Sequence, residues 1–150
     1  TAGPAELGVW ITDRTGEGPF PRTLRLVPRS LILGIGCRRG TPEAAIEAAA
    51  AAALAGLAPE AVAGVATIDL KKDEPGLLAF CARRGLPLTT YSAEALAAVA
   101  GDFTPSAFVQ GITGVDNVCE RAASAAGGRI IVPKQANNGV TAAVARKDTL

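Results

Sequence analysis

The sequence predicts an α/β fold, a three-layer α/β/α sandwich around a mostly parallel, mixed sheet. Short apolar runs, which are typical of buried strands, alternate with alanine-rich or amphipathic segments, which are typical of helices. Clusters of glycine and proline separate these segments. Short strand–helix units favour a parallel sheet with helices on both faces. Ligands of such sheets bind at the carboxyl ends of the strands, so function is expected in the loops there.

We divide the chain after residue 30. The earlier part contains a strand-like run at 6–14, a glycine- and proline-rich loop at 15–21 and a half-exposed strand or linker at 22–30. We interpret residues 1–30 as a linker or as the end of a preceding region, and residues 31–150 as one domain. The chain begins with Thr1 and contains no methionine, which suggests a piece of a longer polypeptide.

The domain opens with the run LILGIG at 31–36, which predicts a strand buried on both faces. A helix is expected directly after it. Thr41 is a favoured N-cap residue, and Pro42 is tolerated at the first helical position. We expect this helix to end near Leu54, with Gly56 as its stop.

The later elements follow from the same patterns. Apolar runs predict strands, and amphipathic or alanine-rich runs predict helices. Ser92 is a plausible helix cap, and the polar stretch 135–139 predicts the turn between the last two strands. We therefore expect strands at 64–70, 86–91, 128–134 and 139–146, helices at 76–85, 92–100 and 115–127, and an irregular stretch at 101–114.

Composition limits the possible classes of function. The 150 residues are 49% hydrophobic and 19% charged, with a net charge of +1. Such a chain is globular and has no electrostatic reason to bind nucleic acid or a membrane surface. No apolar run approaches the roughly 18 residues that cross a bilayer, and no signal-peptide pattern is present. Three widely spaced cysteines, Cys37, Cys81 and Cys119, favour the reducing cytoplasm over a disulfide framework or a zinc site.

The chain contains no histidine. This excludes Ser-His-Asp and Cys-His catalytic pairs and histidine metal sites within it. Proton transfer would have to use a carboxylate, lysine, tyrosine, cysteine or water. The sequence offers no convincing set of metal ligands, so we expect no metal site and no cofactor.

The loop after the first buried strand, GIGCRRGT, indicates an anion site. Its glycines, Gly34, Gly36 and Gly40, let backbone amides approach a ligand, and the following helix offers unpaired N–H groups. Arg38 and Arg39 add forked donors that suit a carboxylate or a phosphate. The alternative is a tight turn with two solvated arginines. The spacing Gly-x-Gly-x-x-x-Gly departs from the dinucleotide pattern Gly-x-Gly-x-x-Gly.

A second charged stretch, IDLKKDEPG, follows the next strand. It contains Asp69, Lys71, Lys72 and Glu74. Because the carboxyl ends of neighbouring parallel strands share one edge of a sheet, it should lie beside the arginine loop. By local pattern alone, an ordinary solvated loop is the simpler interpretation.

Three further residues are weaker candidates. Cys37 lies near two arginines and a helix start, which are conditions that lower a thiol pKa, but it has no base partner. Glu120 lies on the expected 115–127 helix beside Arg121, where two solvated charges are the simpler interpretation. Lys134 follows a strand and either joins a cationic rim or is solvated.

Several segments, taken together, resemble the C-terminal domain of the cobalamin-biosynthesis CbiG proteins; a similar domain occurs alone as CobE. They are, in order, LILGIGCRRGT, TIDLKKDEPGLLAFCARRGLPLTTYSAEAL, GVDNVCERAA, IIVPK and GVTAAVAR. The resemblance covers residues 31–146, and its specificity lies in the combination. Residues 31–150 would then be a CbiG C-terminal or CobE-like domain.

The resemblance implies a reaction. CbiG is the cobalt-precorrin-5A hydrolase of the oxygen-independent pathway, which opens a δ-lactone on the corrinoid macrocycle and releases acetaldehyde. The expected anion would then be a carboxylate arm of this tetrapyrrole, and cobalt would arrive only within the substrate. The implied substrate-binding residues are Gly34, Gly36, Cys37, Arg38, Arg39, Thr41, Lys71, Lys72 and Lys134.

Lactone hydrolysis needs an activated water and a stabilised oxyanion. Without histidine, the candidate bases are Glu74, Asp69 and Glu120, in that order, and the backbone amides of residues 36–38 are candidates for holding the oxyanion. Two alternatives stay open: a non-catalytic, CobE-like corrinoid-binding module, and a nucleotide-binding domain that uses the glycine loop. An N-terminal domain of the same polypeptide is the possible protein partner.

Overall fold

The computed structural model describes residues 7–11, 22–26, 29–99, 103 and 117–147. Within them, five strands form one mixed sheet in the order β5-β4-β3-β7-β6. Three of these strands are parallel: β3 (Leu31–Cys37), β4 (Val62–Ile68) and β5 (Leu88–Tyr91). The other two are β7 (Val140–Arg146), antiparallel to β3, and β6 (Arg129–Asn137), antiparallel to β7. A separate parallel pair consists of β1 (Leu7–Ile11) and β2 (Arg22–Leu26).

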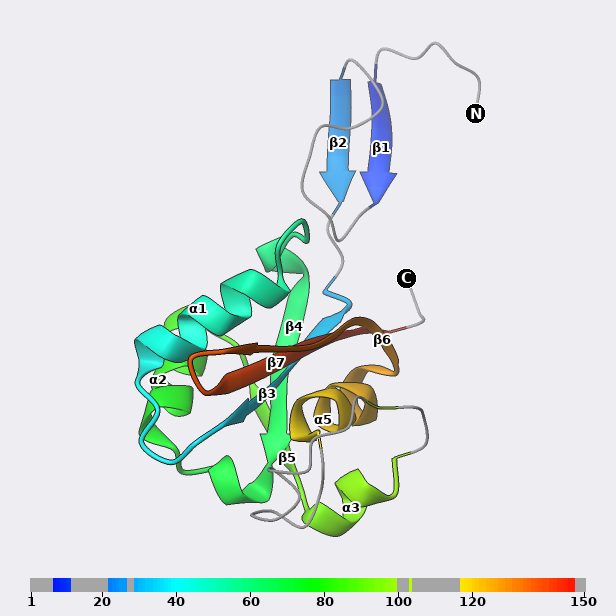
Figure 1. Cartoon of the computed structure of the whole chain (residues 1–150). Coiled ribbons are helices and arrows are strands. Elements are labelled where there is room, and N and C mark those ends of the chain that lie inside the picture. The colour runs from blue at the N-terminus through cyan, green and yellow to red at the C-terminus, as the bar shows by residue number, and fades with distance from the viewer. Residues whose placement is uncertain (1–6, 12–21, 27–28, 100–102, 104–116, 148–150) are drawn as a thin grey trace.

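Helices cover both faces of the five-stranded sheet (Figure 1). One face carries α1 (Glu43–Ala53) and α2 (Pro75–Arg84), and the other carries α3 (Ala93–Ala97) and α5 (Val118–Gly127). Two 3-10 turns, η1 (Pro59–Ala61) and η2 (Asp69–Lys71), flank β4. The predicted three-layer α/β/α sandwich with a mixed sheet is confirmed.

The central strand β3 is buried on both faces, as its apolar run predicts. Leu31, Leu33 and Ile35 belong to the core beneath α1 and α2, whereas Ile32 belongs to the core beneath α5. This division follows from the alternation of side chains along a strand. Because β3 is the middle strand of the five, its carboxyl end lies at the centre of the edge where ligands of such sheets bind.

Helix caps agree with the sequence at two positions and differ at one. Ser92 caps α3, accepting a hydrogen bond from the amide of Ala95 at 3.0 Å. Gly85 ends α2 in the left-handed conformation. The prediction of Thr41 as an N-cap is wrong, because the cap position belongs to Pro42. The Thr41 hydroxyl instead closes the preceding loop by donating to the carbonyl oxygen of Arg38 at 2.6 Å.

Several element bounds are displaced from the prediction. Strand β4 begins two residues earlier than predicted, and it also ends two residues earlier, because residues 69–70 belong to η2. Strand β6 extends to Asn137, which leaves only Asn138 and Gly139 in the turn to β7. Their φ angles of 52° and 80° suit the tight Asn-Gly hairpin. Helix α5 begins at Val118, and residues 115–116 lie outside the described part.

Some expectations fall largely outside the described residues. These are the loop at 15–21 and, apart from Phe103, the irregular stretch at 101–114. Among the helices that the structure describes, none combines the length and apolarity that a membrane span requires.

Candidate functional site at the carboxyl edge of the sheet

Two loops meet at the carboxyl edge of the sheet. The loop from β3 to α1, which carries Arg38 and Arg39, lies against the turn from β4 to α2. The amide of Gly40 donates to Oε1 of Glu74 at 2.6 Å. A Cβ atom at Gly76 would overlap the carbonyl oxygen of Thr41, so the two loops are in direct contact. The predicted neighbourhood of the arginine loop and the charged stretch is confirmed.

Glu74 connects these two loops from the start of α2. It occupies the N-cap position of α2, with Pro75 at the first helical position. Its side chain does not cap its own helix but turns toward Gly40. Only 8% of the residue is exposed. A buried carboxylate needs hydrogen-bond donors, and the Gly40 amide is one.

The cationic residues near the contact between the two loops differ in how exposed they are. Arg38 and Arg39 are exposed, and Lys71 is half-buried. The aliphatic stem of Arg38 approaches the turn between β6 and β7, because a Cβ at Gly139 would lie 4.0 Å from its Cδ. Asp69 and Lys72 are exposed on and just after η2.

Cys37 lies between the two loops and does not behave as predicted. Burial raises the pKa of its thiol above the ordinary 9.0, although Lys71 acts in the opposite direction. Glu74 adds to the rise, and a hydrogen bond with Thr41 lowers the pKa again. The prediction that its surroundings lower this pKa is wrong, because removal from water outweighs the nearby cation.

The other two thiols are more strongly perturbed. Burial raises the pKa of Cys81 to about 11 and that of Cys119 to about 12. Both are free cysteines inside the fold. A thiol is nucleophilic only as the thiolate, so neither has the character of a reactive cysteine near neutral pH.

We expect the free energy of unfolding to fall as the pH rises from about 9 to about 12. Unfolded thiols ionise near the ordinary pKa of 9.0, whereas folded Cys119 stays protonated until about pH 12. The unfolded chain therefore binds fewer protons in this window, and stability present below pH 9 is lost. Urea denaturation at stepped pH should show a shallower decline for Cys119→Ala, by up to about 1.4 kcal/mol per pH unit. Identical declines in the two proteins would contradict this expectation.

Two glycines of the arginine loop have packing roles. Gly34 lies beneath α5, where a Cβ atom would overlap the carbonyl oxygen of Cys119. Gly34 is buried, so it has a role in helix packing, and its role in ligand binding stays a prediction. Gly36 is half-buried, and a Cβ there would lie 2.6 Å from the hydroxyl oxygen of Thr141.

A polar cluster lies on the α5 face of the same edge. Glu120 is only 2% exposed, so the interpretation of this residue as a solvated charge is wrong. Its Oε2 accepts a hydrogen bond from the amide of Lys134 at 2.6 Å. The side-chain oxygen of Asn117 accepts bonds from the Glu120 amide at 3.2 Å and from the Cys119 thiol at 3.3 Å.

Asn117 is a residue that the sequence analysis missed. It is the N-cap of α5 and has a left-handed backbone with φ of 51°. Asparagine tolerates this conformation better than most residues and is favoured at N-caps. The signal was present in the sequence, but the expected helix began at 115 and therefore enclosed it.

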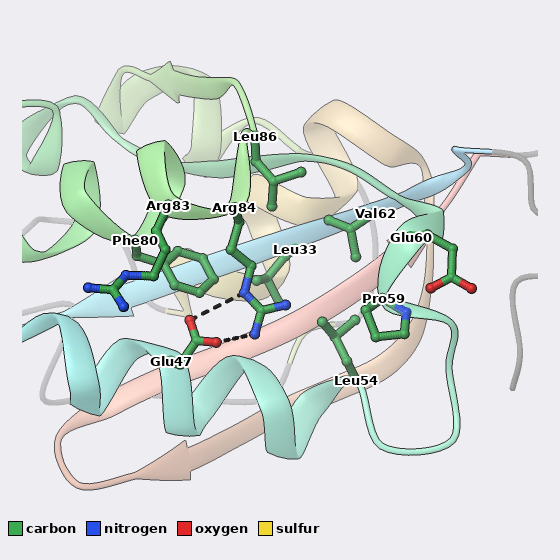
Figure 2. Close-up of a pocket in the computed structure, with 10 residues that line it drawn as sticks. All are labelled: Leu33, Glu47, Leu54, Pro59, Glu60, Val62, Phe80, Arg83, Arg84 and Leu86. Atoms are coloured by element: carbon green, nitrogen blue, oxygen red, sulfur yellow. Dashed lines mark hydrogen bonds and ion pairs between the residues drawn. The ribbon is translucent and has the colours of Figure 1, made fainter.

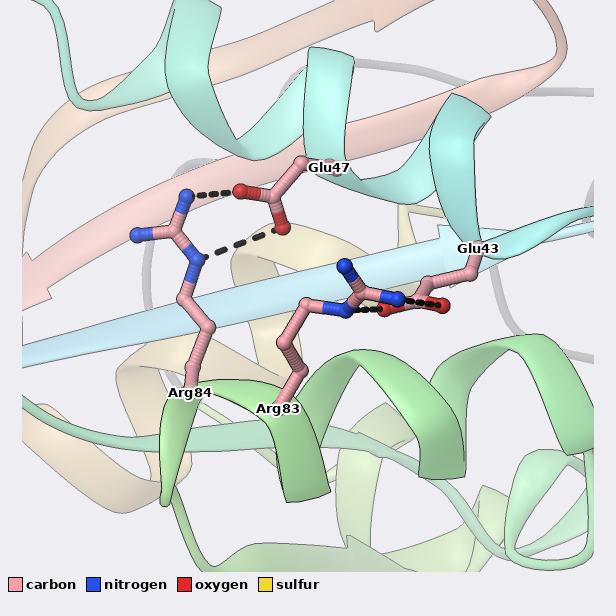
Figure 3. A network of polar contacts seen from close by, with 4 residues as sticks. All are labelled: Glu43, Glu47, Arg83 and Arg84. Carbon is pink, nitrogen blue, oxygen red and sulfur yellow. Dashed lines mark hydrogen bonds and ion pairs between the residues drawn. The ribbon is translucent and has the colours of Figure 1, made fainter.

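A pocket of about 400 Å³ lies away from these loops, between α1 and α2 (Figure 2). Its wall is mainly apolar, and Glu47 of α1 pairs there with Arg84 of α2. A second pair, Glu43 with Arg83 at 2.6 Å, also ties α1 to α2 (Figure 3). None of the predicted site residues lines this pocket, so it is separate from the candidate site.

The structure thus brings together only part of the predicted set. Cys37, Thr41, Lys71 and Glu74 meet where the two loops join, and Glu120 meets Lys134 on the α5 face. Within the described ranges, no three His, Cys, Asp or Glu side chains gather as metal ligands. The arrangement offers exposed Arg38 and Arg39 on the loop that buried Glu74 contacts, and half-buried Lys134 next to buried Glu120.

Comparison with known proteins gives consistent results. A family model described as "Cobalamin synthesis G C-terminus" matches residues 31–145. The protein CobE from Sinorhizobium sp is 39% identical over 126 residues, which are 80% of this chain and 82% of CobE. A cobalt-precorrin-5A hydrolase from Salmonella typhimurium is 40% identical over 111 residues, which are 71% of this chain. The match covers only 31% of that hydrolase, so the chain spans about a third of its length.

A solved structure supports the same relationship. The crystal structure of a CobE protein from the cobalamin biosynthetic pathway superposes on this chain with a TM-score of 0.71 and 30% sequence identity. The superposition covers 78% of this chain and 89% of that CobE chain.

Proposed function

Because this chain belongs to the family of cobalamin synthesis G C-terminal domains, we propose that it binds a corrinoid intermediate by its carboxylate arms. The observation that supports this proposal is the junction of the two loops at the carboxyl edge. Exposed Arg38 and Arg39 extend from a loop that Glu74 holds through the Gly40 amide, with Lys71 close by. Guanidinium groups bind carboxylates through paired hydrogen bonds.

We further propose that the domain contributes to lactone opening in a complete cobalt-precorrin-5A hydrolase. In this scheme, Glu74 accepts a proton from the water that attacks the lactone carbonyl, while the backbone amides of residues 36–38 stabilise the oxyanion. The bond between the carbonyl carbon and the ring oxygen then breaks, and Glu74 returns the proton to that oxygen, which leaves a carboxylic acid and a hydroxyl group. The later loss of a two-carbon fragment yields acetaldehyde. Asp69 is the second candidate for the base, and cobalt remains a part of the substrate.

An N-terminal domain of the same polypeptide is the partner that we propose for this activity. The Salmonella relative is about three times as long as the segment it shares with this chain. The free thiols support a location in the reducing cytoplasm.

A second candidate function is a corrinoid-binding module without catalysis. The match to CobE covers 82% of that protein, whereas the match to the hydrolase covers 31%. Both candidates require the same binding site, so a binding experiment tests what they share.

Corrinoids that differ only in the chemistry of their arms should distinguish carboxylate recognition. We expect dicyanocobyrinic acid, which has carboxylate arms, to bind at least about tenfold more tightly than dicyanocobinamide, whose arms are amides. Because charge-assisted hydrogen bonds contribute about 1.5–3 kcal/mol, Arg38→Ala with Arg39→Ala should weaken binding about 10- to 100-fold. Isothermal titration calorimetry measures both effects.

Arg129→Ala is the matched control. Arg129 is an exposed arginine at the first residue of β6, and the other end of this strand is the one that leads to the turn near Arg38. It should bind the acid as the unchanged protein does. Equal affinity for the two corrinoids, or an unchanged affinity in the double arginine variant, would exclude the proposed site.

A further inference from the structure

Strand β6 is irregular where it passes α5. Its pairing with β7 shifts register between Ile130 and Val132 and again between Val132 and Gln135. In the second shift, residues 133 and 134 together face one residue of β7, which is a β-bulge. Pro133 lies at this point and has no N–H to donate to a ladder. The bulge thus releases the neighbouring Lys134 amide from the sheet.

The carboxylate of Glu120 takes up the released amide. Glu120 lies in the first turn of α5, in the layer next to the sheet, and its Oε2 accepts a hydrogen bond from the Lys134 amide at 2.6 Å. Glu120 is 2% exposed, and its own amide is held by the Asn117 side chain. A charge this deeply buried is costly unless it has partners, and the N-terminal end of a helix dipole favours an anion.

Lys134 is thereby placed on the α5 side of the carboxyl edge. The charges of Lys134 and Glu120 act in opposite directions on the pKa of the same thiol, Cys119, and the nearby Thr141 hydroxyl lowers that pKa. The Thr141 hydroxyl donates to the carbonyl oxygen of Gly36 at 3.3 Å. A continuous set of polar contacts thus connects the bulge with the end of β3, where the arginine loop begins.

We propose that Glu120 is a positioning residue, which anchors the Pro133–Lys134 bulge so that the Lys134 ammonium group binds a carboxylate arm of the corrinoid. The inference rests on the proposed function, because it assigns Lys134 to the same corrinoid site. Glu120 is then no longer a candidate base, and its role is to hold the backbone amide of Lys134.

Two near-isosteric variants separate anchoring from charge. Glu120→Gln keeps the reach and an acceptor oxygen but loses the charge, whereas Glu120→Asp keeps the charge but shortens the side chain by one methylene. Affinity for dicyanocobyrinic acid should stay within about threefold in Glu120→Gln. It should fall about tenfold in Glu120→Asp and in Lys134→Ala, the loss expected from one charge-assisted contact.

The double variant Glu120→Asp with Lys134→Ala should bind no more weakly than Lys134→Ala alone, because residues that act as one unit are not additive. Thr67→Val is the structural control, since it removes a buried hydrogen bond to the Ile35 carbonyl at 2.7 Å. It should lower stability but leave affinity unchanged. The proposal would be overturned if the losses of affinity from Glu120→Asp and Lys134→Ala added up in the double variant. It would also be overturned if Glu120→Gln bound dicyanocobyrinic acid more weakly than Glu120→Asp.

A second measurement does not depend on the corrinoid. Hydrogen exchange at the Lys134 amide, followed by NMR, should be faster in Glu120→Asp than in the unchanged protein and nearly unaffected in Glu120→Gln. Unchanged exchange in Glu120→Asp would refute the anchoring role by itself. Failure of the unchanged protein to bind dicyanocobyrinic acid, with exchange as expected, would instead count against the proposed function.

Discussion

Gly34→Ala is expected to lower the free energy of unfolding by about 3 kcal/mol, the upper end of the usual cost of overpacking a core. The new Cβ would overlap the carbonyl oxygen of Cys119 and lie 2.8 Å from the Cβ of Ala123. Both atoms belong to α5, and a backbone carbonyl cannot rotate out of the way as a side chain does. The whole helix would have to move away from β3. Urea denaturation followed by circular dichroism measures the loss.

Gly64→Ala is the matched control for this experiment. Gly64 lies in the neighbouring strand β4, and a Cβ there would lie 3.2 Å from the carbonyl oxygen of Pro87. A shift of a few tenths of an ångström relieves such a contact, so we expect a cost below about 1 kcal/mol, near that of other mild substitutions. Equal losses in the two variants would show that α5 does not rest on β3 as described.

Glu74→Gln in a full-length hydrolase that carries this domain is expected to lower turnover about 10²- to 10⁴-fold, the usual contribution of a general base. The glutamine oxygen can still accept from the Gly40 amide, so the arginine loop should keep its place and KM should change little. The rate of acetaldehyde release at saturating substrate measures the effect.

Glu47→Gln provides the corresponding control. Glu47 lies on α1 and pairs with Arg84 of α2, and neither of these residues belongs to the two site loops. Turnover should be unchanged in this variant. Normal acetaldehyde release by Glu74→Gln would remove Glu74 as the base and leave its contact with Gly40 as its role.

The two buried carboxylates illustrate where the sequence was informative. Glu74 was expected beside the arginine loop, because both follow neighbouring parallel strands, and the bond to Gly40 confirms that neighbourhood. Glu120 gave no comparable signal. Its partner Lys134 lies on β6, and the bulge that frees the Lys134 amide is a property of strand register. Register depends on how whole strands pair.

The outcomes at Thr41, Cys37 and Gly34 share a related cause. The residue types suit a helix cap, a thiol of lowered pKa and a flexible loop. The Thr41 hydroxyl bonds to Arg38, burial outweighs Lys71 at Cys37, and α5 covers Gly34. Each outcome depends on competition among contacts, which local residue preferences do not contain.

The sequence by itself determined the layered α/β architecture, the family resemblance and the meeting of two charged loops at one sheet edge. Alternating strand and helix patterns leave few topologies, and parallel strands carry their following loops to the same side. Tertiary structure alone decided which carboxylates are buried, which amides they hold and which glycines support a helix. These features arise from desolvation and from close packing between segments far apart in the chain, such as the contact of Gly34 with α5.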